Sequence, residues 1–158
     1  SNLIWRHLVL ETVNIKIGIE VITHQNVVEH PHVQVLINDK VQFDKIMEHS
    51  DIINFNVELE EDQQHKLTIV YDNKSARHDV VLQDGLPIKD KRIEINRISF
   101  NDINLDFFTL SSQDSLSYTT TDPQGENTTG FDATKLSWNG STILLFESPI
   151  YIWILENL

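Results

Sequence analysis

Histidines close together in this chain are candidate ligands for a transition-metal ion. His30-Pro31-His32 places two imidazoles two residues apart, and His24 lies shortly before them. In an extended strand, residues i and i+2 share a face, so both rings could turn toward one ion. Pro31 favours an irregular stretch, however, and the spacing fixes no third ligand. Histidines held at strand ends by other groups are the competing interpretation, so the metal ligands stay unknown.

Carboxylate pairs are the other candidates for chemistry. Asp102 with Asp106, or Glu60 with Glu61, could act as the two acids of a glycoside hydrolase. With 24 acidic residues in the chain, however, some must be neighbours by chance. A nucleophilic triad is not indicated, because there is no cysteine and no Gly-x-Ser-x-Gly motif, and His65 reads as a structural histidine at the start of a strand. We therefore predict no catalytic residue and no enzyme activity.

Oxygen ligands for calcium are present at one predicted turn. Asp84-Gly85, together with Asp90, offers carboxylate and backbone oxygens, which are the ligands that calcium prefers. No EF-hand loop occurs. We therefore predict no obligatory cofactor, with calcium as a candidate ion in a structural role.

Aromatic side chains could form a platform on which a sugar ring stacks. The candidates are Trp5, Tyr118, Phe131, Trp138, Tyr151 and Trp153. Trp153 alternates with isoleucines and is better explained by packing. We predict that Tyr118, Phe131 and Trp138 contact a partner protein or a glycan. For Trp138, which precedes an Asn-Gly hairpin turn, packing against the core is the favoured interpretation and contact with a ligand the other one.

Alternating apolar and polar residues predict the strands that must position these groups. The pattern covers residues 15–21, 33–37, 53–59 and 67–71, and returns in the last third of the chain. Asn38-Asp39, Asp84-Gly85 and Asn101-Asp102 read as tight turns, and a phase change near Asn96-Arg97 predicts a β-bulge. The final run, residues 150–155, is apolar on both faces and reads as a covered strand. Together these patterns predict an all-β fold: an antiparallel two-sheet β-sandwich of the jelly-roll kind with little helix.

Two segments fall outside the strand pattern. The first 13 residues are too apolar for a free terminus, so we predict an N-terminal arm (1–13) that docks on a neighbouring subunit. The sandwich domain (14–158) contains a segment at about 111–134 that is rich in Ser, Thr, Asp, Asn and Gly and reads as one long surface loop. The arm residues predicted to bind a partner are Leu3, Ile4, Trp5, Leu8, Val9 and Leu10.

The overall charge excludes several classes of partner. The 158 residues carry 24 acidic and 12 basic side chains, a formal net charge of −12. Nucleic acids and anionic membrane surfaces are therefore not expected as partners, because both are bound through clusters of Lys and Arg. No apolar run approaches the roughly 20 residues of a membrane span, and no signal-peptide pattern opens the chain.

Motifs in the C-terminal two thirds resemble those of small structural proteins of tailed bacteriophages, particularly marine and cyanobacterial phages. The residues that carry the resemblance are His65-Lys66-Leu67-Thr68-Ile69, Asp84-Gly85, Ile88-Lys89-Asp90-Lys91, Ile98-Ser99-Phe100, Trp138-Asn139-Gly140, Ser148-Pro149 and Tyr151-Ile152-Trp153-Ile154-Leu155-Glu156-Asn157-Leu158. The resemblance spans roughly residues 33–158. It implies a β-sandwich like that of carbohydrate-binding modules and no catalytic residues.

The leading hypothesis is thus a virion protein, a capsid decoration, neck or tail-associated subunit. It would bind other virion proteins as a homo-oligomer or on a lattice, where repetition strengthens weak contacts. The alternative is a carbohydrate-binding module, with or without calcium, that recognises a host surface glycan.

Overall fold

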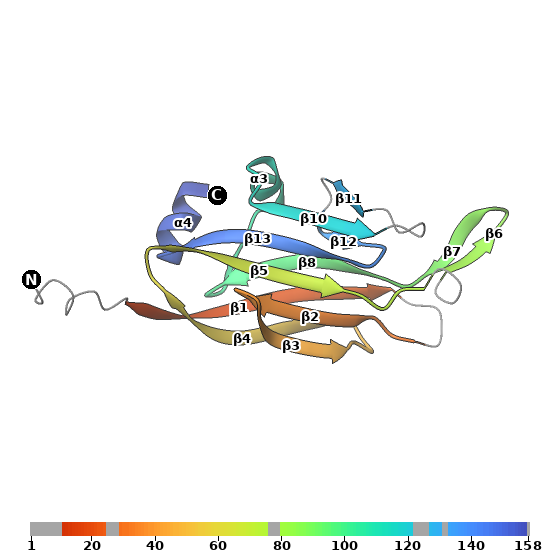
Figure 1. Ribbon diagram of the computed structural model, residues 1–158, viewed down its shortest axis with the longest axis horizontal. Helices are drawn as coiled ribbons and strands as arrows, with labels where there is room; N and C mark the ends of the chain where they lie inside the picture. The colour runs from red at the N-terminus through yellow and green to blue at the C-terminus, as the bar shows by residue number, and fades with distance from the viewer. Residues whose placement is uncertain (1–10, 25–28, 76–79, 122–126, 131–132, 158) are drawn as a thin grey trace, which may run out of the picture.

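Two antiparallel sheets stacked face to face form the body of the molecule (Figure 1). The computed structural model describes residues 11–24, 29–75, 80–121, 127–130 and 133–157. Sheet A has the order β12-β8-β1-β4, with β9 also paired to β8, and sheet B has the order β11-β10-β13-β5-β2-β3. A separate β6–β7 hairpin projects from one end, and helix α4 lies at the other end (Figure 1). The predicted fold class, an all-β two-sheet sandwich, is confirmed.

The elements have the following bounds. Sheet A contains β1 (Thr12–His24), β4 (Asp51–Glu60), β8 (Arg92–Phe100), β9 (Ile103–Asn104) and β12 (Lys135–Leu136). Sheet B contains β2 (His32–Ile37), β3 (Lys40–Ile46), β5 (Gln63–Tyr71), β10 (Leu116–Thr121), β11 (Asn127–Gly130) and β13 (Gly140–Ser148). The hairpin is β6 (Val80–Gln83) with β7 (Leu86–Asp90), and the helices are α3 (Phe107–Ser112) and α4 (Ile150–Asn157).

The core lies between the sheets and is built from the alternating residues of their strands. Ile15, Ile17, Ile19 and Val21 of β1 are fully buried, which confirms the first predicted strand. At the end of the sandwich covered by α4, the rings of Phe100 and Phe146 have centroids 4.7 Å apart, and Trp153 packs edge-on against both rings. Each strand therefore turns the alternate set of residues to the outside, where a binding site can form.

Backbone turns and the bulge lie where the sequence predicts them. Asn38, Asp39, Asn101 and Asp102 have positive φ angles, as tight hairpin turns require, and so do Asp84 and Gly85. In the β1–β8 ladder, Glu20 lies opposite Arg97 while Val21 lies opposite Ile95. Asn96 is thus the extra residue of a β-bulge, which confirms that prediction.

The predicted C-terminal strand is wrong. Residues 150–155 belong to helix α4, which follows Pro149. A short run that is apolar at every position fits a strand or a helix equally well. The structure buries Ile150, Trp153 and Ile154, the i, i+3, i+4 spacing of a helix, and leaves Tyr151, Ile152 and Leu155 exposed.

The segment at 111–134 is not one long loop. It contains the end of α3, all of β10 and β11, and residues 122–126 and 131–132 lie outside the described part of the chain. β10 pairs with β13 over the whole stretch from Leu116 to Thr120, and Leu116 is buried. Thr-rich strands at the side of a sheet need few apolar residues, because backbone hydrogen bonds to the neighbouring strand hold them.

The boundary of the N-terminal arm is also shifted. β1 begins at Thr12, so the last two residues assigned to the arm belong to the sandwich. The six predicted partner-binding residues of the arm lie outside the described residues. None of the helices in the described ranges is long and apolar enough to cross a membrane.

Candidate functional site

A polar hollow opens on the outer face of sheet A, where glycine interrupts β1. Gly18 lies directly opposite Asn54 of β4 on one side and Ser99 of β8 on the other. The absence of a side chain at Gly18 leaves a depression of about 340 Å³, which lies at the small end of the range for small-molecule sites. The hollow is lined by Gly18, Ile52, Asn54, Arg97, Ser99, Asp102 and Asn104.

Gly18 is the residue that makes room for this site. A Cβ atom at Gly18 would lie 2.7 Å from Ser99 Oγ and 3.1 Å from Asn54 Oδ1. Both distances are shorter than normal contacts, so any other residue would push these two polar groups away. A glycine inside a strand weakens the strand and often marks a close approach of another group. Here the glycine lets the polar side chains of three neighbouring strands surround one space.

The charged residues around the hollow are already paired. Arg97 Nη2 lies 3.0 Å from Glu20 Oε2, and Lys16 Nζ lies 3.0 Å from Asp102 Oδ1. The neighbouring charges therefore cancel, although the chain as a whole carries a net charge of −12. Within the described part of the chain, the side chains of Asn54, Ser99 and Asn104 make no hydrogen bond. Two amides and a hydroxyl are thus available to a ligand.

The predicted acid pairs do not converge in this hollow or elsewhere. Asp106 caps helix α3, accepting hydrogen bonds from the Phe108 and Thr109 backbone N–H groups and from the Thr109 hydroxyl at 2.9 Å. The hydrogen bond from the Thr109 hydroxyl is the largest cause that lowers the pKa of Asp106 below its usual value. Glu60 accepts from Gln63 Nε2 at 2.6 Å. Asp102 lines the hollow as its single carboxylate, so the two acids of a glycoside hydrolase are not assembled there.

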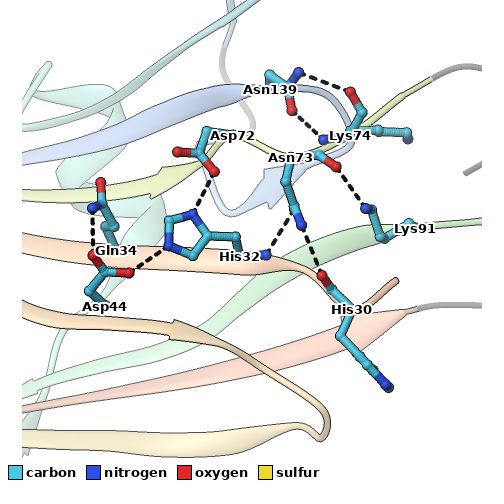
Figure 2. A network of polar contacts seen from close by, with 9 residues as sticks. All are labelled: His30, His32, Gln34, Asp44, Asp72, Asn73, Lys74, Lys91 and Asn139. Atoms are coloured by element: carbon cyan, nitrogen blue, oxygen red, sulfur yellow. Dashed lines mark hydrogen bonds and ion pairs between the residues drawn. The ribbon is translucent and has the colours of Figure 1, made fainter. Parts of the chain in front are cut away.

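A second polar cluster lies at the end of sheet B and ties three strands together (Figure 2). Asn73 follows β5; its Oδ1 accepts from His32 N at 2.8 Å, and its Nδ2 donates to His30 O at 3.0 Å. Asn139 makes the same two kinds of bond to the backbone of Lys74: its Oδ1 accepts from Lys74 N at 2.7 Å, and its Nδ2 donates to Lys74 O at 3.1 Å. Each asparagine side chain thus substitutes for a strand partner, which satisfies backbone groups where the ladders end.

Two buried lysines complete this cluster. The Lys74 side chain is 1% exposed; its Nζ contacts Asp90 and the Ser137 carbonyl and lies 4.3 Å from the centre of the Trp138 ring. Lys91 is fully buried and donates from Nζ to Asn73 O at 2.7 Å. Buried charges of this kind need partners, and these contacts supply them. The cluster therefore holds the fold together and offers no open binding site.

His32 sits between two carboxylates at the side of the same cluster. Nδ1 lies 2.7 Å from Asp72 Oδ1, and Nε2 lies 2.5 Å from Asp44 Oδ1 (Figure 2). Because both ring nitrogens face acceptors, the doubly protonated ring alone satisfies both contacts. The hydrogen bonds to Asp72 and then to Asp44 raise the pKa of His32 above 6.5.

We expect the contacts of His32 with Asp72 and Asp44, here called the His32 clamp, to make the stability of the fold depend on pH. The folded-state pKa of His32 is above the unfolded value, so the stabilisation is fully present below about pH 6.5 and is lost as the pH rises through the folded-state pKa. The free energy of unfolding, measured by urea titration between pH 6 and 9, should fall over this range. His32→Gln should remove this fall. An identical pH profile in both proteins would contradict the clamp.

The histidines predicted as metal ligands do not form a site. Both ring nitrogens of His32 contact carboxylates, Figure 2 shows the His30 ring pointing away from His32, and His24 Nε2 lies 3.5 Å from Glu94. No group of three or more histidine or acidic side chains among the described residues could hold a metal ion. Pro31 precedes β2, so His30 lies outside the strand and the two-residue spacing does not place both rings on one face.

The predicted calcium ligands are likewise separated. Asp84 lies in the turn of the β6–β7 hairpin, while Asp90 lies at its open end, opposite Val80. The Asp90 carboxylate contacts the Lys74 ammonium. Asp84 and Asp90 therefore do not form one site.

The predicted aromatic contacts are placed as follows. Tyr118 is half-buried in β10 and packs against the core. Trp138 is also half-buried, with Lys74 Nζ above its ring. It lies in the connection from β12 of sheet A to β13 of sheet B, and these two strands do not pair. The predicted hairpin turn at Trp138–Ser141 is therefore wrong. Phe131 lies outside the described residues. The described side chains do not gather into an aromatic platform, and the contact roles of Tyr118, Phe131 and Trp138 stay predictions.

Apart from Asp102, which was a candidate acid, the residues of the hollow were not predicted as site residues from the sequence. Gly18 does stand out in the sequence, since it occupies a solvent-facing position of a strand whose neighbours on that face are Lys16 and Glu20. Asn54, Ser99 and Asn104 carry no such signal, because the register that joins them to Gly18 comes from strands far apart in the chain.

Comparison with known proteins gives one structural neighbour. No protein-family model matches the chain, and no curated protein matches it. A solved structure described as "vCBM60 in complex with galactobiose" is similar with a TM-score of 0.47 and 10% sequence identity, covering 82% of this chain and 96% of that chain. The comparisons do not bear on a virion origin, so assembly in a virion stays a prediction from the sequence.

Proposed function

We propose that this protein is a carbohydrate-binding module whose ligand occupies the hollow at Gly18. The observation that carries the proposal is the convergence of Asn54, Ser99 and Asn104 around a floor without a side chain. Side-chain amides and hydroxyls both donate and accept hydrogen bonds, which matches the mixed donor and acceptor character of sugar hydroxyls. Ile52, 44% exposed, adds an apolar wall for the C–H groups of a sugar.

The charge of the site favours an uncharged ligand. Arg97 and Asp102 are each engaged by an opposite charge, so an acidic sugar would have to displace Glu20 from Arg97. The net charge of −12 further disfavours acidic polysaccharides and nucleic acids. A neutral glycan meets neither obstacle. In this site hydrogen bonds hold the sugar, and no aromatic ring among the described residues stacks on it. Each hydrogen bond contributes only about 0.5–1.5 kcal/mol to the binding free energy.

A glycan array followed by calorimetric titration tests this proposal. We expect neutral oligosaccharides to bind, and Asn54→Ala or Asn104→Ala to weaken binding about three- to tenfold, since each removes hydrogen bonds worth about 0.5–1.5 kcal/mol. Asn14→Ala is the matched control, because Asn14 is an exposed asparagine of β1 that does not line the hollow. Binding should also survive chelation of divalent cations.

Two outcomes would contradict the proposal. Absence of any glycan ligand on the array would reject the function itself. Binding that is as sensitive to Asn14→Ala as to Asn54→Ala would place the ligand elsewhere on sheet A.

A further inference from the structure

β4 forms one side of sheet A and is open from Ile52 to Glu58. It pairs with β1 from Thr12–Glu60 to Val21–Asp51, and no strand among the described residues pairs with its other side. The last hydrogen bond of the ladder runs from Glu61 N to Glu11 O at 2.8 Å. It shows that the backbone N–H and C=O groups of the odd-numbered residues of β4 point toward β1. In an antiparallel ladder these positions alternate, so the even-numbered residues from Ile52 to Glu58 point free N–H and C=O groups away from the sheet. At Glu60 the carbonyl already accepts a hydrogen bond from Ser148 Oγ at 2.6 Å and lies 2.8 Å from His65 Nε2.

β4 also has few of the features that usually protect an open strand from pairing. It is ten residues long, contains no Pro, Gly, Lys or Arg, and its register with β1 is unbroken. β3, the open strand of sheet B, differs: it carries Lys40 and Lys45, and its register shifts opposite Val35 and Leu36. β12 has only two residues and β11 only four. Long, unprotected strands of this kind are templates for another strand.

We propose that β4 pairs with β4 of a second copy, antiparallel about a twofold axis at Asn56. Among the side chains that face the core, this register places Phe55 opposite Val57 of the second copy and Ile53 opposite Leu59. Facing solvent, it places Asn54 opposite Glu58 and Ile52 opposite Glu60. Phe55 and Val57 are half-buried in one copy, so pairing would cover apolar surface.

The charges of β4 agree with a second copy as the partner. The two glutamates of the solvent face, Glu58 and Glu60, lie in one half of the strand. An antiparallel copy brings that half against Asn54 and Ile52, so neither Glu58 nor Glu60 faces an acidic side chain directly across the axis. Aromatic and β-branched residues such as Phe55 and Val57 are favourable cross-strand pairs, each contributing about 0.2–1 kcal/mol.

The dimer has a consequence that rests on the proposed function. Sheet A would continue from one copy into the other, so both Gly18 hollows would open on the same face. Two linked sites on a repetitive glycan bind more tightly than one, without any new contact to the sugar. Self-association itself does not depend on any glycan, so its failure and the failure of the proposed function are distinguishable.

Sedimentation of the full chain over a range of concentrations tests the dimer. We expect the mass to approach twice 18.3 kDa as concentration rises. Asn56→Asp should weaken association at least about tenfold, because it places two carboxylates together at the axis, while within one copy the new carboxylate faces Lys16. Gln113→Glu, the same charge change at an exposed position after α3, should leave association unchanged. A monomer at every concentration, or an Asn56→Asp dimer of unchanged affinity, would overturn the proposal.

Cysteine cross-linking tests the register, because the chain contains no cysteine of its own. Asn56→Cys should form a disulfide-linked dimer on oxidation, since directly paired residues have Cα atoms about 5.5 Å apart. Gln113→Cys should not. Deleting residues 1–10 should leave the dimer intact. Equal cross-linking of both variants, or loss of the dimer on this deletion, would overturn β4 pairing.

Discussion

Asp90→Ala is expected to lower the free energy of unfolding by about 3–5 kcal/mol, because it removes a carboxylate that contacts the buried Lys74 ammonium. The Lys74 side chain is 1% exposed, so water cannot replace the lost partner. Two of its other contacts, with the Ser137 carbonyl and the Trp138 ring, are made by groups without a formal charge. Urea denaturation at neutral pH measures the loss.

Lys74→Met is the matched control for this effect. It removes the ammonium and keeps a side chain of similar length, and the Asp90 side chain that it leaves unpaired is 19% exposed and can be hydrated. We therefore expect a smaller loss, about 1–2 kcal/mol. Equal losses for the two variants would show that the contact acts through packing alone and not through the burial of charge.

Gly18→Val is expected to abolish glycan binding while the protein stays folded. Its Cβ would lie 2.7 Å from Ser99 Oγ, and its methyl groups would fill the space between Asn54 and Ser99. The side chain would point to the outer face of sheet A, away from the core, and β-branched residues suit strands. The melting temperature should therefore change by only a few degrees, since the gain in strand propensity offsets the displaced Ser99 side chain.

Asn14→Val separates this effect from a general change of the surface. It introduces the same side chain on the same strand and outer face, outside the hollow. Glycan affinity should be unchanged in this variant. Full affinity in Gly18→Val, measured by calorimetry beside a thermal melt of each protein, would exclude the hollow as the binding site.

Much of the fold is predictable because strand periodicity is local. The alternation in β1, the positive-φ turns at Asn38-Asp39 and Asn101-Asp102, and the bulge at Asn96 are all visible in short windows of sequence. α4 was not predictable in this way, because every residue of 150–155 is apolar and the period is hidden. β10 was missed because its strand character comes from pairing with β13 and not from its own apolar residues.

The candidate site depends on information that a single sequence lacks. Gly18, Asn54 and Ser99 become neighbours only through the registers of β1 with β4 and with β8. The buried cluster shows the same limit: Asn139, before Gly140, reads as a turn residue, whereas the structure uses its side chain, like that of Asn73, to close the end of a strand. A glycine on the solvent face of a strand is the one local signal that points to the hollow.

The most direct test of the glycan site is a titration of the ¹⁵N-labelled protein, followed by NMR, with the neutral oligosaccharide that gives the strongest array signal. We predict that the backbone amide shifts of Gly18, Asn54, Ser99 and Asn104 change together and saturate, and that the same titration of Gly18→Val leaves these amides unmoved. Shifts that cluster around Tyr118 and Trp138, or that persist at the hollow in Gly18→Val, would contradict the assignment of glycan binding to the hollow.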